Sequence, residues 1–201
     1  NVKQALESTI FIVAKGDPEP TVRAEALMAL SLYDKPIYKE LIQRSVNDSS
    51  YSVAGAAVLS LNQLDKPEAY AAAKKLTATK TKGKLAEAIS NVFAENSKAE
   101  DLDYVLDWYN ALPFGQSKVE NANTVAYYAI QLQNTDGVKK ATDALVAFRD
   151  QIPSAYQKDI YPFVNNVLLK TIATQKTSMK NLATDPAAIQ EQVDYINSKI
   201  K

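Results

Sequence analysis

The sequence predicts an all-α protein built as an α-solenoid, a right-handed superhelix of antiparallel helical hairpins. Three observations carry this prediction. The chain repeats itself with an offset of 31 residues, which is typical of stacked repeat units. Apolar residues recur at helical spacing almost throughout. Alternation with a period of two never persists.

The repeat is clearest between Asp17 and Leu76. Moving the sequence by 31 residues keeps the small and large apolar positions in order and repeats one turn motif. The superposed residues are Val22 on Val53, Ala26 on Ala57, Leu30 on Leu61, and Asp34-Lys35-Pro36 on Asp65-Lys66-Pro67.

These matches predict one helical-repeat domain over residues 1–201. Residues 17–47 and 48–78 form two clear repeats, 79–97 a degenerate third one, and 98–201 divergent helical pairs. The chain begins without methionine and enters an amphipathic pattern directly, so we expect a segment of a longer protein.

The apolar pattern predicts about ten to eleven helices, each burying one stripe of side chains. The stripes run over residues 5–14, 22–33, 37–46, 53–64, 70–76, 88–92, 102–112, 122–132, 138–148, 163–172 and 189–200. Small residues at 54–57 and 71–73 predict close approach between helices.

Residues that cap or break helices mark the boundaries. Asp17, Asp48 and Asp185 are predicted N-caps. Gly83 is expected to end one helix before the next, and Pro162 to open or kink a helix.

The overall composition argues against several classes of function. The chain has 23 basic and 23 acidic residues, so no net field favours nucleic acid or an anionic membrane. It has no cysteine and no histidine, which most zinc sites and most acid–base mechanisms use. No apolar run is long enough to span a membrane.

The segment D-P-E-P-T-V-R-A-E-A-L-M-A-L-S-L, from Asp17 to Leu32, resembles the second-helix signature of HEAT-type repeats. In that signature an aspartate precedes a valine–arginine pair and an alanine–leucine stripe. The copy that starts at Asp48 resembles it too, but has Ala54 in place of the arginine. The resemblance implies a HEAT- or armadillo-like solenoid, with an Asp–Arg ladder between units that is interrupted at Ala54.

The tyrosine-bearing version of this repeat, with its Asp-Lys-Pro turns and looser helical tail, resembles the C-terminal domain of bacterial M1-family zinc aminopeptidases. The resemblance implies a domain that packs on an upstream catalytic domain and shapes substrate access. Neither H-E-x-x-H nor G-x-M-E-N is present. Zinc is therefore implied only for that upstream domain, and no catalytic, cofactor or metal residue is carried over.

Two charged clusters each allow two interpretations. Lys74, Lys75, Lys80, Lys82 and Lys84, with threonines between them, are either a phosphate-binding surface or a solvated helix end, and we favour the second. Glu100, Asp101 and Asp103 are either a cation site or first-turn residues of a helix, and the helix dipole favours the second.

The aromatic residues predict a contact surface. Trp108 and Tyr109 are neighbours on one predicted helix, and Tyr127 and Tyr128 on another. Because neighbouring helical positions differ by about 100° around the axis, these four rings cannot all point inward. We expect a surface for a partner here, with partial burial under loops as the competing view.

Taken together, the residues predict a non-catalytic scaffold, and two kinds of partner fit it. One is a catalytic domain upstream in the same chain, as the aminopeptidase resemblance implies. The other is a separate protein or peptide bound by a free-standing interaction scaffold. Nucleic acid and a membrane span are not expected. The resemblance to bacterial proteins leaves both the bacterial cytoplasm and the periplasm open.

Overall fold

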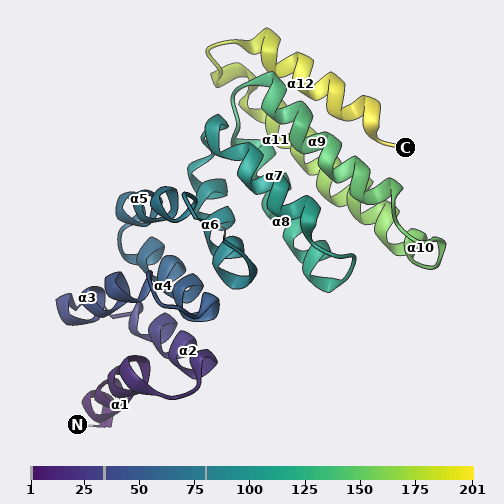
Figure 1. The fold of residues 1–201 in the computed structure, drawn as a ribbon. Coiled ribbons are helices and arrows are strands. Elements are labelled where there is room, and N and C mark those ends of the chain that lie inside the picture. Colours follow the sequence, from purple (N-terminus) through teal and green to yellow (C-terminus); the bar gives the residue numbers. More distant parts are fainter. Residues whose placement is uncertain (1, 34, 80) are drawn as a thin grey trace. The chain divides into compact units, whose positions relative to one another are not determined.

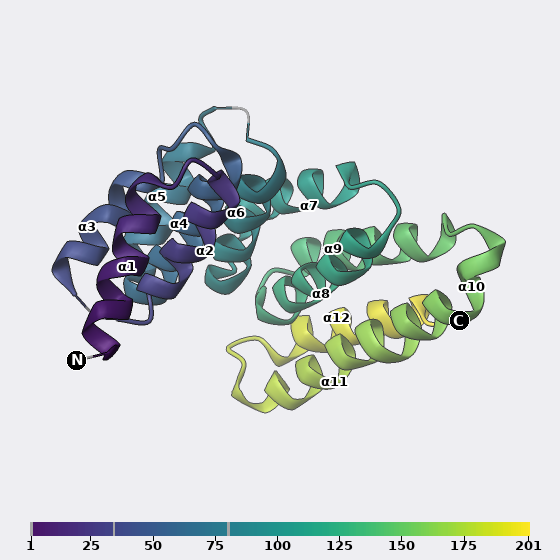
Figure 2. The ribbon, with the colours of Figure 1, turned by 90° about the horizontal axis from the view of Figure 1, so that it is seen from below.

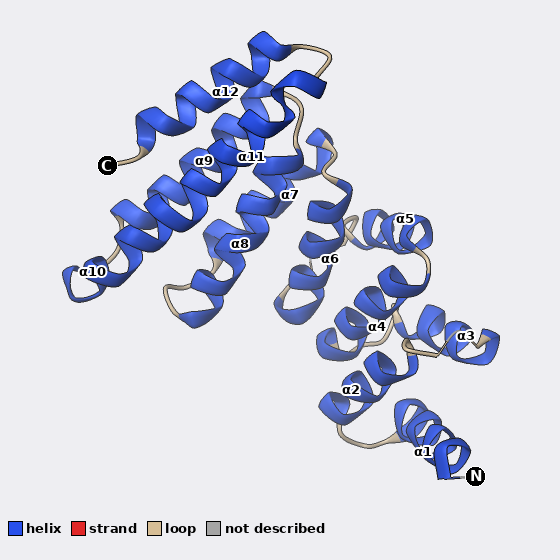
Figure 3. Cartoon of the chain, turned by 180° about the vertical axis from the view of Figure 1, so that it is seen from behind, coloured by secondary structure: helices blue, strands red, loops and turns tan. Residues whose placement is uncertain are grey.

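The computed structural model describes residues 2–33, 35–79 and 81–201, with the side chains of Val2 and Lys3 left out. All regular structure in these ranges is helical, as Figure 3 shows, and the all-α prediction is confirmed. The chain divides into two compact units, residues 1–93 and 94–201. A single domain over residues 1–201 stays a prediction.

The N-terminal unit consists of six helices in two layers (Figures 1 and 2). Helices α2, α4 and α6 follow one another in one layer, and α1, α3 and α5 form the other. Helix α4 packs on α2, α3 and α5, while α1 packs on α2. The bounds are α1 Val2–Gly16, α2 Pro20–Leu30, α3 Pro36–Ser45, α4 Tyr51–Leu64, α5 Lys66–Leu76 and α6 Gly83–Asn96, of which the last three residues belong to the second unit.

Equivalent positions of the repeat are buried in the same way in α2, α4 and α6. Each of these helices buries an alanine followed by two large aliphatic residues, all at most 7% exposed. The three sets are Ala26, Leu27 and Leu30; Ala57, Val58 and Leu61; and Ala88, Ile89 and Val92. Equivalent positions of the three copies are therefore buried alike, and the division into two clear repeats and a degenerate third one stays a prediction.

Ion pairs tie the α1, α3 and α5 layer together. Lys35, just before α3, pairs with Glu7 of α1, which is buried. Lys39 of α3 pairs with Asp65 at 2.8 Å and with Glu68 at 3.0 Å. Hydrogen bonding to these carboxylates raises the pKa of Lys39, and the same lysine lowers the pKa of Asp65.

The predicted caps are confirmed only in part. Asp185 caps α12, accepting hydrogen bonds from the N–H groups of Ala187 and Ala188 at 3.1 and 3.0 Å. Asp17 and Asp48 are not N-caps, because α2 and α4 begin three residues after them. Each instead accepts a hydrogen bond from the N–H two residues on, at 2.9 Å for Asp17 and 2.8 Å for Asp48. These bonds form Asx turns that lead into the helices.

The predicted close approach of helices occurs at Gly55. A Cβ atom added there would lie 2.5 Å from the Lys84 carbonyl oxygen and 2.7 Å from its carbon, at the start of α6. Only glycine fits at this distance, because the opposing atoms belong to backbone. Gly83, with φ of 59°, begins α6 rather than ending α5, so its expected role is wrong.

The C-terminal unit contains two stacked hairpins. Helix α8 packs on α9 and α11 on α12, while α9 contacts α12 and α8 contacts α11. Helix α7 lies against α8 and α9. The predicted division of residues 98–201 into divergent helical pairs stays a prediction. The bounds are α7 Leu102–Ala111, α8 Gln116–Gln131, α9 Thr135–Asp150, α10 Ser154–Pro162, α11 Lys170–Met179 and α12 Pro186–Lys199.

Pro162 lies inside a continuous helix. Helix α10 passes without a break into the π-helical segment η2, Phe163–Leu169, and then into α11. Proline has no N–H to donate and crowds the preceding turn, so the backbone after it changes its hydrogen-bond spacing. Within the described ranges, the labelled segments α1 to α12 therefore amount to eleven helices, as predicted.

A buried arginine holds the end of the chain to the C-terminal unit. Arg149, in the last turn of α9, is 1% exposed. Its Nη1 donates to Asn165 Oδ1 at 2.6 Å and to the Lys199 carbonyl at 2.7 Å. Its Nε donates to Asp150 Oδ1 at 2.8 Å. These charge-assisted bonds offset the cost of burying the guanidinium group.

A buried lysine in the same unit has a lowered pKa. Lys176 of α11 is fully buried, and its Nζ donates to the Leu132 carbonyl at the end of α8. This carbonyl accepts a hydrogen bond from one of the three donors of the ammonium group and supplies no compensating negative charge,. Burial therefore lowers the pKa of Lys176 to about 8,.

We predict that Gly55→Ala destabilises the N-terminal unit by about 1–3 kcal/mol, because α4 and α6 must separate to admit the methyl group. This loss exceeds the gain of about 1 kcal/mol in helix propensity. Urea unfolding followed by circular dichroism measures the change.

Gly16→Ala is the matched control, since a Cβ atom there meets nothing within 4 Å. It is expected to leave stability unchanged or slightly raised. Equal stability of Gly55→Ala and the parent protein would contradict the close packing of α4 on α6.

We predict that the C-terminal unit becomes more stable between pH 7.5 and 9.5. The pKa of Lys176 is about 8 in the folded chain and about 10.4 in an unfolded one. Between these values the unfolded chain binds more protons, so stability rises with pH, by about 1–2 kcal/mol over this window. Urea unfolding followed by fluorescence of Trp108, the single tryptophan, reports on this unit.

Lys176→Met is expected to remove most of this rise, whatever its effect on stability at pH 7. Lys170→Met, at an exposed position of the same helix, should retain it. A rise that persists in Lys176→Met would assign the pH dependence to another group.

Candidate functional site: a groove on the α2, α4 and α6 layer

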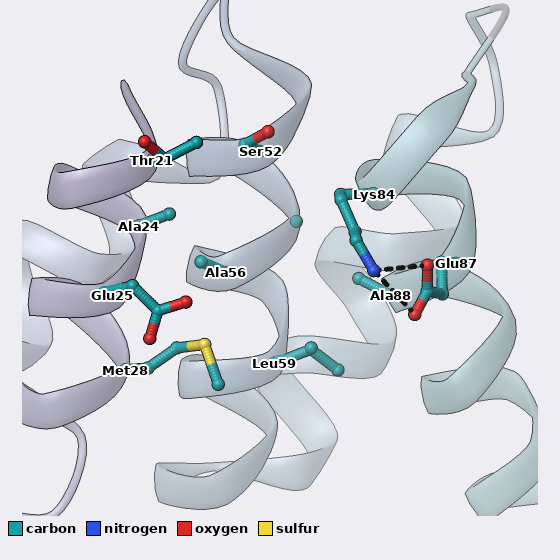
Figure 4. A pocket seen from close by; sticks show the side chains of 11 residues that line it. Thr21, Ala24, Glu25, Met28, Ser52, Ala56, Leu59, Lys84, Glu87 and Ala88 are labelled. Carbon is teal, nitrogen blue, oxygen red and sulfur yellow. Dashed lines mark hydrogen bonds and ion pairs between the residues drawn. The ribbon is translucent and has the colours of Figure 1, made fainter. Parts of the chain in front are cut away.

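The surface of the α2, α4 and α6 layer carries a groove with a volume of about 380 Å³. It lies wholly within the N-terminal unit. Figure 4 shows side chains from all three helices around it. Helix α4 lies in the middle, with α2 on one side and α6 on the other.

The repeat dictates which residues reach the groove. On α2 and α4 the lining side chains lie four and then three positions apart, which places them on one helical face. These residues are Thr21, Glu25 and Met28 on α2, and Ser52, Ala56 and Leu59 on α4. An offset of 31 residues superposes the two sets in order, so successive repeats present equivalent positions.

The floor of the groove consists of small residues. Ala24, Gly55, Ala56 and Ala88 line it, and the three alanines are at most 8% exposed. Small side chains let the helices approach closely and leave space above them. At the position of Ala56 the neighbouring repeats carry glutamates, Glu25 and Glu87. The hollow therefore opens where the middle repeat has lost a long side chain.

An adjoining hollow of about 400 Å³ extends the groove along α2 and α4. Both hollows share Glu25, Met28 and Leu59, and the second adds Leu32. Met28 is 43% exposed and Leu32 71% exposed. Exposed aliphatic side chains along a furrow are a feature of surfaces that bind other proteins.

Of the charged side chains that line the groove, two form an ion pair with each other and one does not. Lys84 pairs with Glu87 one turn away on α6, at 3.0 Å (Figure 4). Glu25 has no ion-pair or hydrogen-bond partner among the residues that the structure describes. The groove therefore presents one uncompensated negative charge beside its aliphatic residues.

The predicted aromatic surface is divided between the inside and the outside of the C-terminal unit. Tyr109 and Tyr128 are fully buried there, with Tyr109 against Phe148 and Tyr128 donating to the Lys98 carbonyl. They are unavailable to a partner while the unit is folded. Tyr127 is 45% exposed and Trp108 half-buried, so a contact role for these two residues stays a prediction.

The lysine cluster has structural partners. Lys74 lies over the ring of Phe93, with Nζ 5.8 Å from the centroid, and Lys82 over the ring of Tyr51 at 5.6 Å. Lys84 pairs with Glu87. Lys75 is exposed at the end of α5, and Lys80 lies outside the described residues. These contacts favour the solvated helix end over a phosphate-binding surface.

The acidic cluster also has structural surroundings. Asp103 lies in the first turn of α7 and pairs with Lys140 at 2.8 Å, while Asp101 is buried. Glu100 lies in the short 3₁₀ turn before α7. No group of acidic residues suited to holding a metal ion is found in the described ranges. The first-turn interpretation fits this geometry.

One rung of the Asp–Arg ladder is present. Nη2 of Arg23, on α2, lies 3.8 Å from Oδ1 of Asp48, which precedes α4. Nη1 of Arg23 donates to the Asp17 carbonyl at 2.8 Å. The next rung is missing on both sides, because Ala54 replaces the arginine and Thr79 the aspartate. The interruption expected at Ala54 follows directly from these two residues.

Comparison with known proteins agrees with this fold. The family profile described as HEAT repeats matches residues 8–92, which lie within the N-terminal unit. The chain thus contains a helical-repeat domain of HEAT-like character. Comparisons with curated proteins and with solved structures give no match, and the aminopeptidase resemblance stays a proposal. None of the helices that the structure describes is long and apolar enough to cross a membrane.

Proposed function

We propose that this protein is a non-catalytic scaffold that binds a protein segment in the groove on α2, α4 and α6. The observation that carries the proposal is the groove itself, with exposed Met28 and Leu32 beside a floor of small residues. Repeated helices hold these side chains at fixed spacing, so the surface is formed before a partner arrives. Binding then costs little ordering of the scaffold.

The resemblance to M1-family aminopeptidases suggests a finer form of this proposal. In that form the partner is a catalytic domain of the same polypeptide, and the helices shape access to a cavity whose zinc chemistry lies upstream. The sequence of residues 17–76, with its Asp-Lys-Pro turns, supports it. In the alternative form the partner is a separate protein or peptide. An H-E-x-x-H motif upstream of Asn1 in the parent gene selects the first form.

We predict that groove binding depends on the exposed aliphatic residues. Peptides selected from a random phage-displayed library on this protein should lose most of their affinity for a Met28→Gln, Leu32→Gln double variant. Losing two aliphatic contacts is expected to weaken binding about tenfold or more. Fluorescence anisotropy of the labelled peptides measures the change.

Ile12→Gln combined with Ile37→Gln is the matched control. These residues are 69% and 55% exposed on α1 and α3, away from the groove. Selected peptides should bind this variant as they bind the parent. If every selected peptide binds both double variants as tightly as it binds the parent, the groove is not the binding surface.

The non-catalytic character has its own test. We predict that the purified chain binds no Zn²⁺ in a tight stoichiometric complex and hydrolyses no member of a peptide panel, because it lacks histidine and cysteine,. Isothermal titration with Zn²⁺ and chromatography of the panel measure both. Tight one-to-one binding or peptide cleavage would contradict the scaffold proposal.

A further inference from the structure

We infer that the groove takes an extended segment of another protein in which a lysine or arginine lies two or three residues from an aliphatic side chain. The inference rests on the proposed function and specifies the chemistry of the partner. In this arrangement the basic residue pairs with Glu25, and the aliphatic side chain fills the furrow beside Met28, Leu32 and Leu59.

The charge of the groove is the evidence for a lysine or arginine in the bound segment. Three charged side chains line the groove, namely Glu25, Lys84 and Glu87. Lys84 and Glu87 compensate each other at 3.0 Å. Glu25 is left without a partner among the described residues, and it lies next to Met28 on the α2 side of the groove (Figure 4). A cation in the bound segment provides the missing partner, and an anion there is repelled.

The spacing of residues along the groove is the evidence for an aliphatic side chain in the bound segment. Glu25 lies five residues before the last residue of α2, about 7.5 Å along a helix that rises 1.5 Å per residue, and Leu32 follows in the turn beyond that end. An extended segment covers about 7.5 Å in two to three residues. This spacing places a basic residue over Glu25 while an aliphatic residue lies between Met28 and Leu32. The small floor at Gly55 and Ala56 gives the segment's backbone room to lie close.

The arrangement also explains a difference between repeats. Glu25, Ala56 and Glu87 occupy equivalent positions of the repeat. If Ala56 were a third glutamate, it would fill the hollow and place another negative charge beside Glu25. With alanine in the middle repeat, the hollow is open and its charge is concentrated on the α2 side.

The experiment uses the full chain and a random peptide library displayed on phage. Peptides selected on the parent protein should be enriched in a lysine or arginine two or three residues from Leu, Ile, Val or Met. Peptides selected on Glu25→Lys should instead carry Asp or Glu at that position. Enrichment of acidic residues on the parent protein, or the same motif on both proteins, would overturn the inference.

Affinities of one enriched peptide complete the test. Glu25→Gln should weaken binding about two- to fivefold and Glu25→Lys about tenfold, since exposed ion pairs are individually modest. Changing the peptide's lysine to glutamate should restore its binding to Glu25→Lys. Glu40→Lys, a charge reversal on exposed α3, should stay within twofold of the parent. Circular dichroism confirms that each variant is folded.

The outcomes separate this inference from the proposed function. Peptides that lose binding in the Met28→Gln, Leu32→Gln variant, yet carry no basic residue and ignore Glu25→Lys, leave the groove as the binding surface and overturn only the charge assignment. Peptides that are insensitive to both variants overturn both. A soluble second copy of the chain that competes with the peptides would identify self-association as the occupant instead.

Discussion

The close approach of α4 to α6 at Gly55 is the constraint on which the N-terminal unit depends. A Cβ atom at this position would come within 2.5 Å of a backbone oxygen, so the two helices can stack at this distance only over glycine. The alanines around it extend the same small-residue contact to neighbouring turns of the layer. Once the helices stack in this way, Leu27, Val58 and Ile89 are fully buried, and burial of apolar side chains between neighbouring helices stabilises the unit.

The same small residues account for the groove. Because alanine and glycine have short side chains, the surface of the layer is hollow where the helices pack on them. The longer side chains of α2 and α6 form the walls of the groove. The buried stripe and the walls of the groove therefore lie on opposite sides of the same helices. The buried side carries the large aliphatic residues, while the open side carries Thr21, Glu25 and Met28 at helical spacing. The long side chains of the buried stripe and of the groove walls therefore occupy different positions, whereas the small residues of the floor, such as Gly55, serve both helix packing and the groove.

Much of the fold could be predicted from the sequence, whereas the groove could not. The 31-residue offset identified the repeat, because buried positions must recur when identical units stack. Helix starts were less predictable, since an aspartate before a helix forms either an N-cap or an Asx turn, and Asp17 and Asp48 form the latter. The aromatic residues suggested a surface, but tertiary packing buried Tyr109 and Tyr128. The signal in the sequence that could have indicated the groove was a pair of aliphatic residues outside the buried stripe of α2, Met28 and Leu32.

The middle unit departs from the first at three consecutive positions. There Ala54 replaces the arginine of the Asp–Arg ladder, Gly55 replaces an alanine, and Ala56 stands where both neighbouring repeats have glutamate. A regular solenoid gains nothing from breaking its own ladder, because each rung joins one unit to the next. Two of the three changes act on the same space: Gly55 lets α6 lie close to α4, and Ala56 leaves the space above them open. Under the proposed function, the partner segment therefore lies over the part of the layer where the repeat is irregular and a hollow forms,.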